Sequence, residues 1–391
     1  MQSFLSKWMF RNYTTILTIY ILVVAVITIQ SLLLENKTFA PGGIAYPQYN
    51  NYLIFKQSFF HLINNQDLYA SYPAEQGDLF KYSPAFALFF APFAWLPDSF
   101  GLFLWNALNA LCLFAAFAMF PKTDLRSRIL MMLFVLVELV TALQNSQSNA
   151  LIAGMMILAF VMLERDKLFL AALLITGTVY IKLFGVFGFG LFLFYPNKMK
   201  FILYSALCMI LLAVVPLVVI SFDQLKFLYS SWLSLLGYDH DTSNGLSVLG
   251  WITTWFGVAM DKKVLLLTGV VLLGLPFIQI KKFGYFQFRT AMLASILLWI
   301  VIFNHRAESP TFIIAMAGVA VWYFTKQASR VDFILIMLAL VFTSLSTTDL
   351  FPNSIQDNIF DPYVVKAVPC IIIWGKIIFD SFKQKTLSAA H

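Results

Sequence analysis

Residues 35–83 read ENKTFAPGGIAYPQYNNYLIFKQSFFHLINNQDLYASYPAEQGDLFKYS, a long polar stretch between two strongly apolar segments. Most other connections between apolar segments of this chain are only a few residues long. A loop of this length is usually functional or a small domain of its own. Because loops on a rigid scaffold often carry binding and catalytic residues, this segment is the first place to look for chemistry.

The composition indicates a polytopic membrane protein. Hydrophobic residues make up 60% of the chain and charged residues only 12%, and the mean hydropathy is +0.81. Soluble domains are about 25% charged. The net charge of +7 comes from basic residues in short turns, which favours orientation in a membrane over nucleic-acid binding. The three cysteines lie in apolar runs and form no CxxC motif, so we expect neither a metal site nor a cofactor.

A transmembrane helix needs about 17–25 apolar residues, and many apolar runs of this chain come close to that length. They predict an all-α bundle of about twelve transmembrane helices in a single membrane domain, residues 1–391. The candidate spans are residues 13–34, 101–120, 129–143, 149–163, 168–181, 183–196, 201–221, 264–280, 290–304, 310–324, 332–347 and 362–380. The proline-interrupted segment 84–97 reads as a half-helix or an interfacial segment. Most Lys and Arg residues fall on one side, which predicts cytoplasmic termini and two large extracytoplasmic loops, 35–83 and 222–263.

Two predicted helical hairpins, 129–163 and 168–196, are too short to cross a full bilayer twice. Their outer turns carry polar residues, namely Gln144, Asn145, Gln147, Asn149 and Lys182. Since polar groups at membrane depth survive only beside protein or water, we infer a cavity open to the outer side. Thinner lipid or misjudged helix ends would explain the same pattern.

The first outer loop concentrates aromatic and acidic residues. The candidate general bases are Asp67, Glu75 and Asp78, and the candidate substrate-binding residues beside them are Tyr69, Lys81 and Tyr82. Such a set suits sugar recognition, because aromatic rings stack on sugar rings and carboxylates accept hydrogen bonds from hydroxyl groups. A merely solvated loop is the alternative for any single carboxylate.

Isolated charges in apolar surroundings give further candidates. Lys182 is a candidate phosphate ligand, with snorkelling as the alternative. The outer turn FNHRAESPT offers His305, Arg306 and Glu308, where Arg306 suits a phosphate unless it only pairs with Glu308. Glu138 suits either a proton path or a structural hydrogen bond. Asp239 and His240, in the run YDHDTSNG, are expected to make polar contacts to donor or acceptor rather than to bind metal.

Several motifs in order resemble glycosyltransferase family 87 of the GT-C superfamily, which comprises polyprenyl-phosphate-dependent membrane enzymes. They are NNYLIFKQSFFHLINNQDLY, KYSPAFALFFAPFAWLPDSFGLFLWNALNALCLF, NSQSNALIAGMMILA, GTVYIKLFGVF and NHRAESPTF, within residues 45–325. The resemblance implies an outward-facing active site, an inverting transfer and a catalytic Asp early in the first outer loop. That position is Asn51 here, so another carboxylate substitutes, the mechanism differs, or the chain is a non-catalytic relative.

We therefore expect a hexosyltransferase of the bacterial inner membrane. It would move a hexose, with mannose as the expected sugar, from a polyprenyl-phosphate donor to a lipid or glycan acceptor on the extracytoplasmic side. The expected partners are these two substrates and membrane lipids, without nucleic acid. A transporter or lipid flippase is the alternative from another class. It would require polar lining on both sides of the membrane, whereas the polar candidates gather on one side.

Overall fold

The computed structural model describes residues 13–38, 43–238 and 244–383. By its internal contacts the chain divides into two compact units whose segments alternate along the sequence. Unit 1 comprises Met1–Phe120, Leu139–Val186 and Asn197–Asp241. Unit 2 comprises Pro121–Glu138, Phe187–Pro196 and Thr242–His391. The expected all-α fold is confirmed, since the described strands are only two residues each, β1 (Lys37–Thr38) paired antiparallel with β2 (Ala45–Tyr46).

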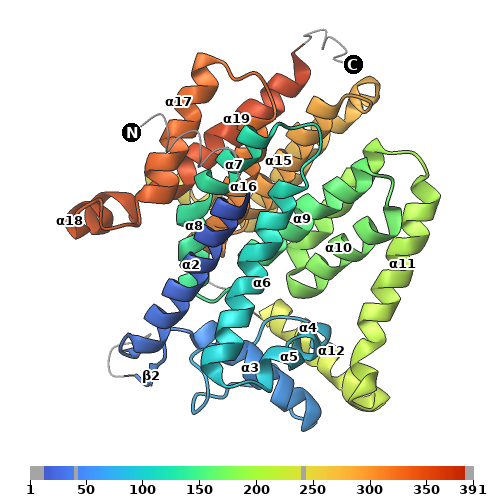
Figure 1. Ribbon diagram of the computed structural model, residues 1–391, viewed down its shortest axis with the longest axis vertical. Helices are drawn as coiled ribbons and strands as arrows, with labels where there is room; N and C mark the ends of the chain where they lie inside the picture. Colours follow the sequence, from blue (N-terminus) through green and yellow to red (C-terminus); the bar gives the residue numbers. More distant parts are fainter. Residues whose placement is uncertain (1–12, 39–42, 239–243, 384–391) are drawn as a thin grey trace. The chain divides into compact units, whose positions relative to one another are not determined.

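Unit 1 contains helices of very different length. They are α2 (Tyr13–Leu33), α3 (Asn50–Ile63), α4 (Pro84–Phe89), α5 (Ala91–Ala94), α6 (Asp98–Ala118), α9 (Asn149–Glu164), α10 (Leu168–Ile181), α11 (Lys198–Val214), the 3₁₀ helix η2 (Val215–Val218) and α12 (Phe222–Tyr238). Helices α2, α6, α9 and α10 pack side by side (Figure 1). Gly154 lets α9 approach α6 closely, because a Cβ there would lie 2.8 Å from the backbone of Cys112. Helix α9 is apolar on all sides, as expected of a helix at the centre of a bundle.

The structure explains how the short spans are built. Helix α10 has 14 residues, about 21 Å at 1.5 Å per residue. It is followed by η1 (Leu183–Phe194), a 3₁₀ helix of 12 residues, whose larger rise of about 2 Å per residue gives it roughly 24 Å. Both are shorter than a hydrocarbon core of about 30 Å. The other expected short hairpin begins with two helices, α7 (Leu125–Phe134) and α8 (Leu136–Gln144), which are bent by 42° where they join.

Segments 84–97 and 222–263, expected as a half-helix or interfacial segment and as a loop respectively, both contain helices. Segment 84–97 forms α4 and α5, two short helices rather than one span, and Ser83 caps α4 by accepting a hydrogen bond from the backbone N–H of Phe86. Residues 222–263, expected as the second extracytoplasmic loop, hold α12 and α13 (Val248–Phe256). Helix α12 buries Leu225, Leu228 and Trp232. Their spacing of three and four residues places them on one face. The side of the membrane on which these segments lie stays a prediction.

Unit 2 is built around α15 (Phe286–Ile302) and α16 (Phe312–Phe324), which pack against each other. Its other elements are α7, α14 (Lys262–Gly274), η3 (Leu275–Ile278), η4 (Ile280–Lys282), η5 (Ser309–Thr311), α17 (Arg330–Leu338), η6 (Ala339–Leu345), α18 (Asn353–Ile355), η7 (Gln356–Phe360), η8 (Val365–Ala367) and α19 (Val368–Phe382). Helices α8 and η1 each cross from one unit to the other along the chain.

Three described helices are long and apolar enough to cross a bilayer alone, namely Tyr13–Leu33, Asp98–Ala118 and Lys198–Val218. Two bent pairs raise the number to five. Most of the other expected spans appear as shorter apolar helices, so the number of about twelve crossings stays a prediction.

Glu138 forms a buried ion pair within unit 2. The Nζ atom of Lys366 lies 2.7 Å from Oε1 of Glu138, and the two side chains are 3% and 0% exposed. Lys366 lies in η8, just before α19, and its backbone carbonyl accepts a hydrogen bond from Thr343 of the π-helical η6 at 2.8 Å. The pair thus joins two interrupted helical segments, and it supports the structural role over a proton path for Glu138.

Removing one partner of this pair should destabilise the protein far more than removing both charges. Lys366→Met leaves an unpaired buried carboxylate, which costs about 3–5 kcal/mol. The double variant Glu138→Gln/Lys366→Met leaves no charge and should regain most of that loss. Thermal unfolding of the detergent-purified protein measures both. A double variant as unstable as Lys366→Met would contradict this account.

Candidate functional site

Helix α3 is the platform of the long loop that connects α2 to α4. It buries Tyr52, Phe55, Phe59 and Leu62, which repeat at three- and four-residue intervals and therefore share one face. Asn50, at its first turn, is buried as well, and its Oδ1 accepts a hydrogen bond from the backbone N–H of Gly77 at 2.9 Å. The helix thereby holds the returning half of the loop.

Asp67 is fixed by groups from two separate segments. Its Oδ1 accepts a hydrogen bond from the backbone N–H of Tyr69 at 3.1 Å. The Ser231 hydroxyl, on α12, lies 3.0 and 2.9 Å from its two carboxylate oxygens. The Tyr72 hydroxyl donates to the Asp67 backbone carbonyl at 2.8 Å. Because hydrogen bonds to a carboxylate are charge-assisted, this side chain has a well-defined position between the loop and α12.

Tyr69 connects the two ends of segment 67–82, which holds the three candidate bases. Its hydroxyl donates to the backbone carbonyl of Tyr82 at 3.0 Å. Burial, with Tyr229 and the charge of Asp67 adding to it, raises the pKa of Tyr69 well above the usual value for tyrosine. The phenol therefore remains a hydrogen-bond donor at neutral pH. Tyr69 is only 6% exposed, so little of its ring is open to a sugar in this conformation.

The other two candidate bases are paired within the loop. Glu75 lies 2.9 Å from Nε2 of His61, whose ring stacks on Tyr72 at 3.9 Å between centroids. Asp78 accepts a hydrogen bond from Lys81 at 3.2 Å, and both side chains are exposed, 56% and 42%. An exposed pair of this kind contributes little to stability, and the Asp78 carboxylate is already engaged by the lysine.

Lys182 is linked to the polar turn 144–149 by a chain of hydrogen bonds. Its Nζ donates to Oδ1 of Asn149 at 2.7 Å, and Nδ2 of Asn149 donates to Oε1 of Gln147 at 2.6 Å. The rings of Tyr82 and Phe184 each lie 5.9 Å from the ammonium group. Lys182 ends α10 in an extended conformation, which turns its side chain out of the helix. The structure thus brings four predicted site residues together: Lys182, Asn149, Gln147 and Tyr82.

Asn51 uses its amide as a donor. Its Nδ2 donates to the backbone carbonyl of Asn145 at 2.9 Å, which ties α3 to the polar turn. An aspartate here would place a carboxylate oxygen against a carbonyl oxygen, with no proton between them. The Asn51 side chain therefore has a structural partner that an aspartate at this position would not have in this arrangement.

The turn with His305, Arg306 and Glu308 belongs to unit 2. The Asn304 side chain accepts a hydrogen bond from the backbone N–H of Arg306 at 3.0 Å. The backbone N–H of Leu246 donates to the Ala307 carbonyl at 2.9 Å. His305 and Arg306 are half-buried and Glu308 is exposed. Asp239 and His240 lie outside the described residues. Lys182 belongs to unit 1, so its joint action with Arg306 stays a prediction.

Sequence reasoning missed the partners that hold the candidate residues. Ser231 and His61 each contact a predicted base across the loop, yet neither stands out by type or spacing. The amphipathic pattern of α12 is the one signal that indicates a helix packed on this loop.

Residues 80–348 match glycosyltransferase family 87. The match covers more than half of the chain. The protein belongs to glycosyltransferase family 87. The matched region includes Lys182 and the turn of Arg306, and it begins after Asn51 and the three candidate bases. No curated protein is similar enough in sequence to this glycosyltransferase to count as a match.

The substitution Asn51→Asp should destabilise this glycosyltransferase by about 1–3 kcal/mol, because it removes a donor and leaves the Asn145 carbonyl unpaired. It should not raise activity. Thermal unfolding and a transfer assay measure the two effects, with Asn64→Asp, at an exposed residue ending α3, as the matched control. A more active Asn51→Asp enzyme would show instead that the catalytic carboxylate belongs at this position.

Proposed function

We propose that this glycosyltransferase moves a hexose, mannose by expectation, from a polyprenyl-phosphate donor to a lipid or glycan acceptor on the extracytoplasmic side of a bacterial plasma membrane. The observation that carries the proposal is the membership in family 87 together with the half-buried Lys182, whose ammonium is hydrogen-bonded to a neutral amide between two aromatic rings. A cation in such surroundings suits a phosphate that carries an apolar tail.

In the proposed reaction an acceptor hydroxyl attacks the anomeric carbon, and its proton passes to a loop carboxylate. The bond from the anomeric carbon to the phosphate oxygen breaks with inversion, and the lipid phosphate leaves with the electron pair. Lys182 and Arg306 would stabilise the charge on the leaving phosphate. Asp67 is the preferred base, because Glu75 and Asp78 are paired with His61 and Lys81, whereas Asp67 is held only by neutral donors among its described partners.

If Asp67 is the base, Asp67→Asn should lower the transfer rate by roughly 10²–10⁴-fold, the usual contribution of a general base. The amide keeps the size of the side chain, so folding should be unaffected. Asp78→Asn, in the exposed pair with Lys81, is the matched control and should stay within a few-fold of the unchanged enzyme. Equal losses in the two variants would remove Asp67 from this role.

Lys182→Ala and Arg306→Ala should each reduce transfer from a polyprenyl-phosphate hexose by about 10²-fold or more, because each removes a cation from the leaving phosphate. Expression should stay close to that of the unchanged protein, and so should the thermal stability of Arg306→Ala. Lys182→Ala should also lower thermal stability by about 1–3 kcal/mol, because it removes the hydrogen bond to Asn149. Single-turnover transfer from radiolabelled polyprenyl-phosphate mannose measures the effect. Unchanged turnover in either variant would refute the phosphate role of that residue.

A further inference from the structure

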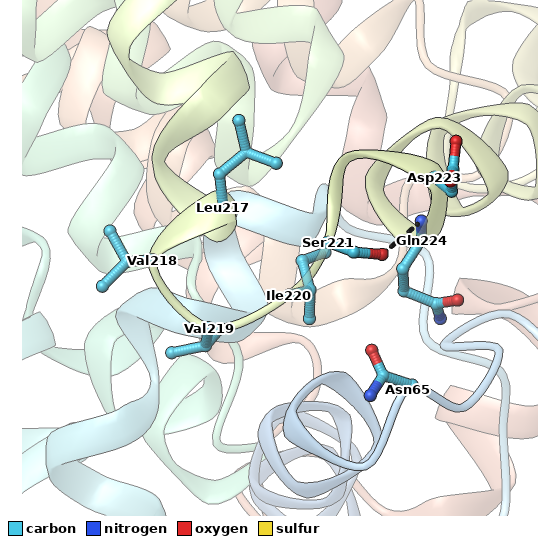
Figure 2. Close-up of a pocket in the computed structure, with 8 residues that line it drawn as sticks. All are labelled: Asn65, Leu217, Val218, Val219, Ile220, Ser221, Asp223 and Gln224. Carbon is cyan, nitrogen blue, oxygen red and sulfur yellow. Dashed lines mark hydrogen bonds between the residues drawn. The ribbon is translucent and has the colours of Figure 1, made fainter.

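A hollow of about 640 Å³ lies in unit 1 where η2 runs into α12, opposite the end of α3 (Figure 2). One wall is apolar and comprises residues 217–220. The other wall is polar and comprises Asn65, Ser221, Asp223 and Gln224. In Figure 2 Asn65 extends from the end of α3 toward Gln224 across the opening. None of the residues considered for the reaction so far lines this hollow.

The walls of the hollow are held by hydrogen bonds. The Ser221 hydroxyl accepts one from the backbone N–H of Gln224 at 3.2 Å, and the Gln224 side chain donates to the backbone carbonyl of Gln66 at 3.3 Å. The Asn65 amide and the Asp223 carboxylate make no hydrogen bond or ion pair within residues 13–38, 43–238 and 244–383. The polar wall therefore offers ready partners to a ligand.

The apolar wall is continuous with a candidate membrane span. Val218 is 79% exposed and ends the apolar segment Lys198–Val218. Only 17% of the residues in the 18-residue apolar window of this segment are buried. Phe222, the first residue of α12, is 68% exposed. Side chains this apolar and this exposed are expected to contact lipid. The hollow is thus open to a lipid chain on one side and to a polar headgroup on the other.

The charge of the hollow disfavours a phosphate. None of the described residues that line it is Lys or Arg, and Asp223 adds a negative charge. Asp223 also lies in the first turn of α12, where a carboxylate offsets the positive end of the helix dipole. Carboxylate and amide groups without a cation suit a neutral headgroup that is rich in hydroxyl groups.

We propose that this hollow binds the acceptor, a lipid-anchored molecule with a neutral, hydroxyl-rich headgroup, and that it excludes the phosphate-linked donor. This inference rests on the proposed transferase function. The next residue after Gln66 is Asp67, and Ser231, which holds Asp67, follows Gln224 on α12 by two helical turns, about 10 Å. A headgroup in the hollow therefore lies beside the segment that carries the proposed base.

A photoreactive probe tests the site without requiring turnover. The full-length protein in phosphatidylcholine nanodiscs is labelled with dodecyl mannoside that carries a diazirine in its alkyl chain, and the labelled peptides are mapped. We expect labelling in residues 217–224 that unlabelled dodecyl mannoside suppresses. Methyl mannoside and undecaprenyl phosphate should not suppress it. Labelling absent from this segment, or equal competition by undecaprenyl phosphate, would overturn the proposal.

Matched variants on α12 sharpen this test. Asp223→Ala should weaken competition by dodecyl mannoside about tenfold, the usual cost of losing a hydrogen bond to a charged group. Lys226→Ala, at an exposed position one turn further along the helix that does not line the hollow, should leave it unchanged. Equal affinities in the two variants would overturn the assignment of Asp223. If the segment is labelled specifically but the protein shows no transfer activity, the hollow still binds an amphiphile and the transferase function is rejected instead.

Discussion

The polar turn 144–149 is the point on which the rest of unit 1 depends. Backbone and side-chain polar groups deep in an apolar bundle must find partners inside the protein. The Trp105 indole donates to the Ser146 carbonyl at 2.8 Å, Asn51 donates to the Asn145 carbonyl, and Lys182 donates to Asn149. Helices α6, α3 and α10 are thereby tied to one turn. A helical hairpin too short for the bilayer is tolerated because its turn is satisfied in this way.

Hydrogen bonds between distant segments also give the described part of the long loop 35–83 a defined structure. The Gly77 backbone N–H donates to Asn50, and the Tyr69 hydroxyl donates to the Tyr82 carbonyl. Helix α12 contacts the loop through Ser231 and Gln224. The carboxylate of Asp67 is consequently held between elements that are distant in the sequence. A polar loop of this length would otherwise lose its positional precision to conformational entropy.

Unit 2 meets the same constraint with charges rather than amides. Glu138 lies just beyond the bend between α7 and α8, and Lys366 lies at the bend before α19. Where two helices are interrupted, backbone groups lose their regular partners, and a buried ion pair needs a close fit to offset its desolvation. The two bends and the ion pair therefore depend on one another.

The sequence by itself determined the class of fold and the family, because hydropathy, helix length and motif order are local properties of the chain. It also singled out Lys182 and Glu138, since an isolated charge in an apolar run is visible without coordinates. The partners of those charges, Asn149 and Lys366, come from segments 33 and 228 residues away. The reason that Asp67 stands apart from Glu75 likewise depends on Ser231 and His61, which lie 164 and 14 residues from the carboxylates that they contact. Only tertiary structure decides such pairings, because hydrogen bonds and ion pairs act over a few ångströms in space and leave no periodic trace along the chain.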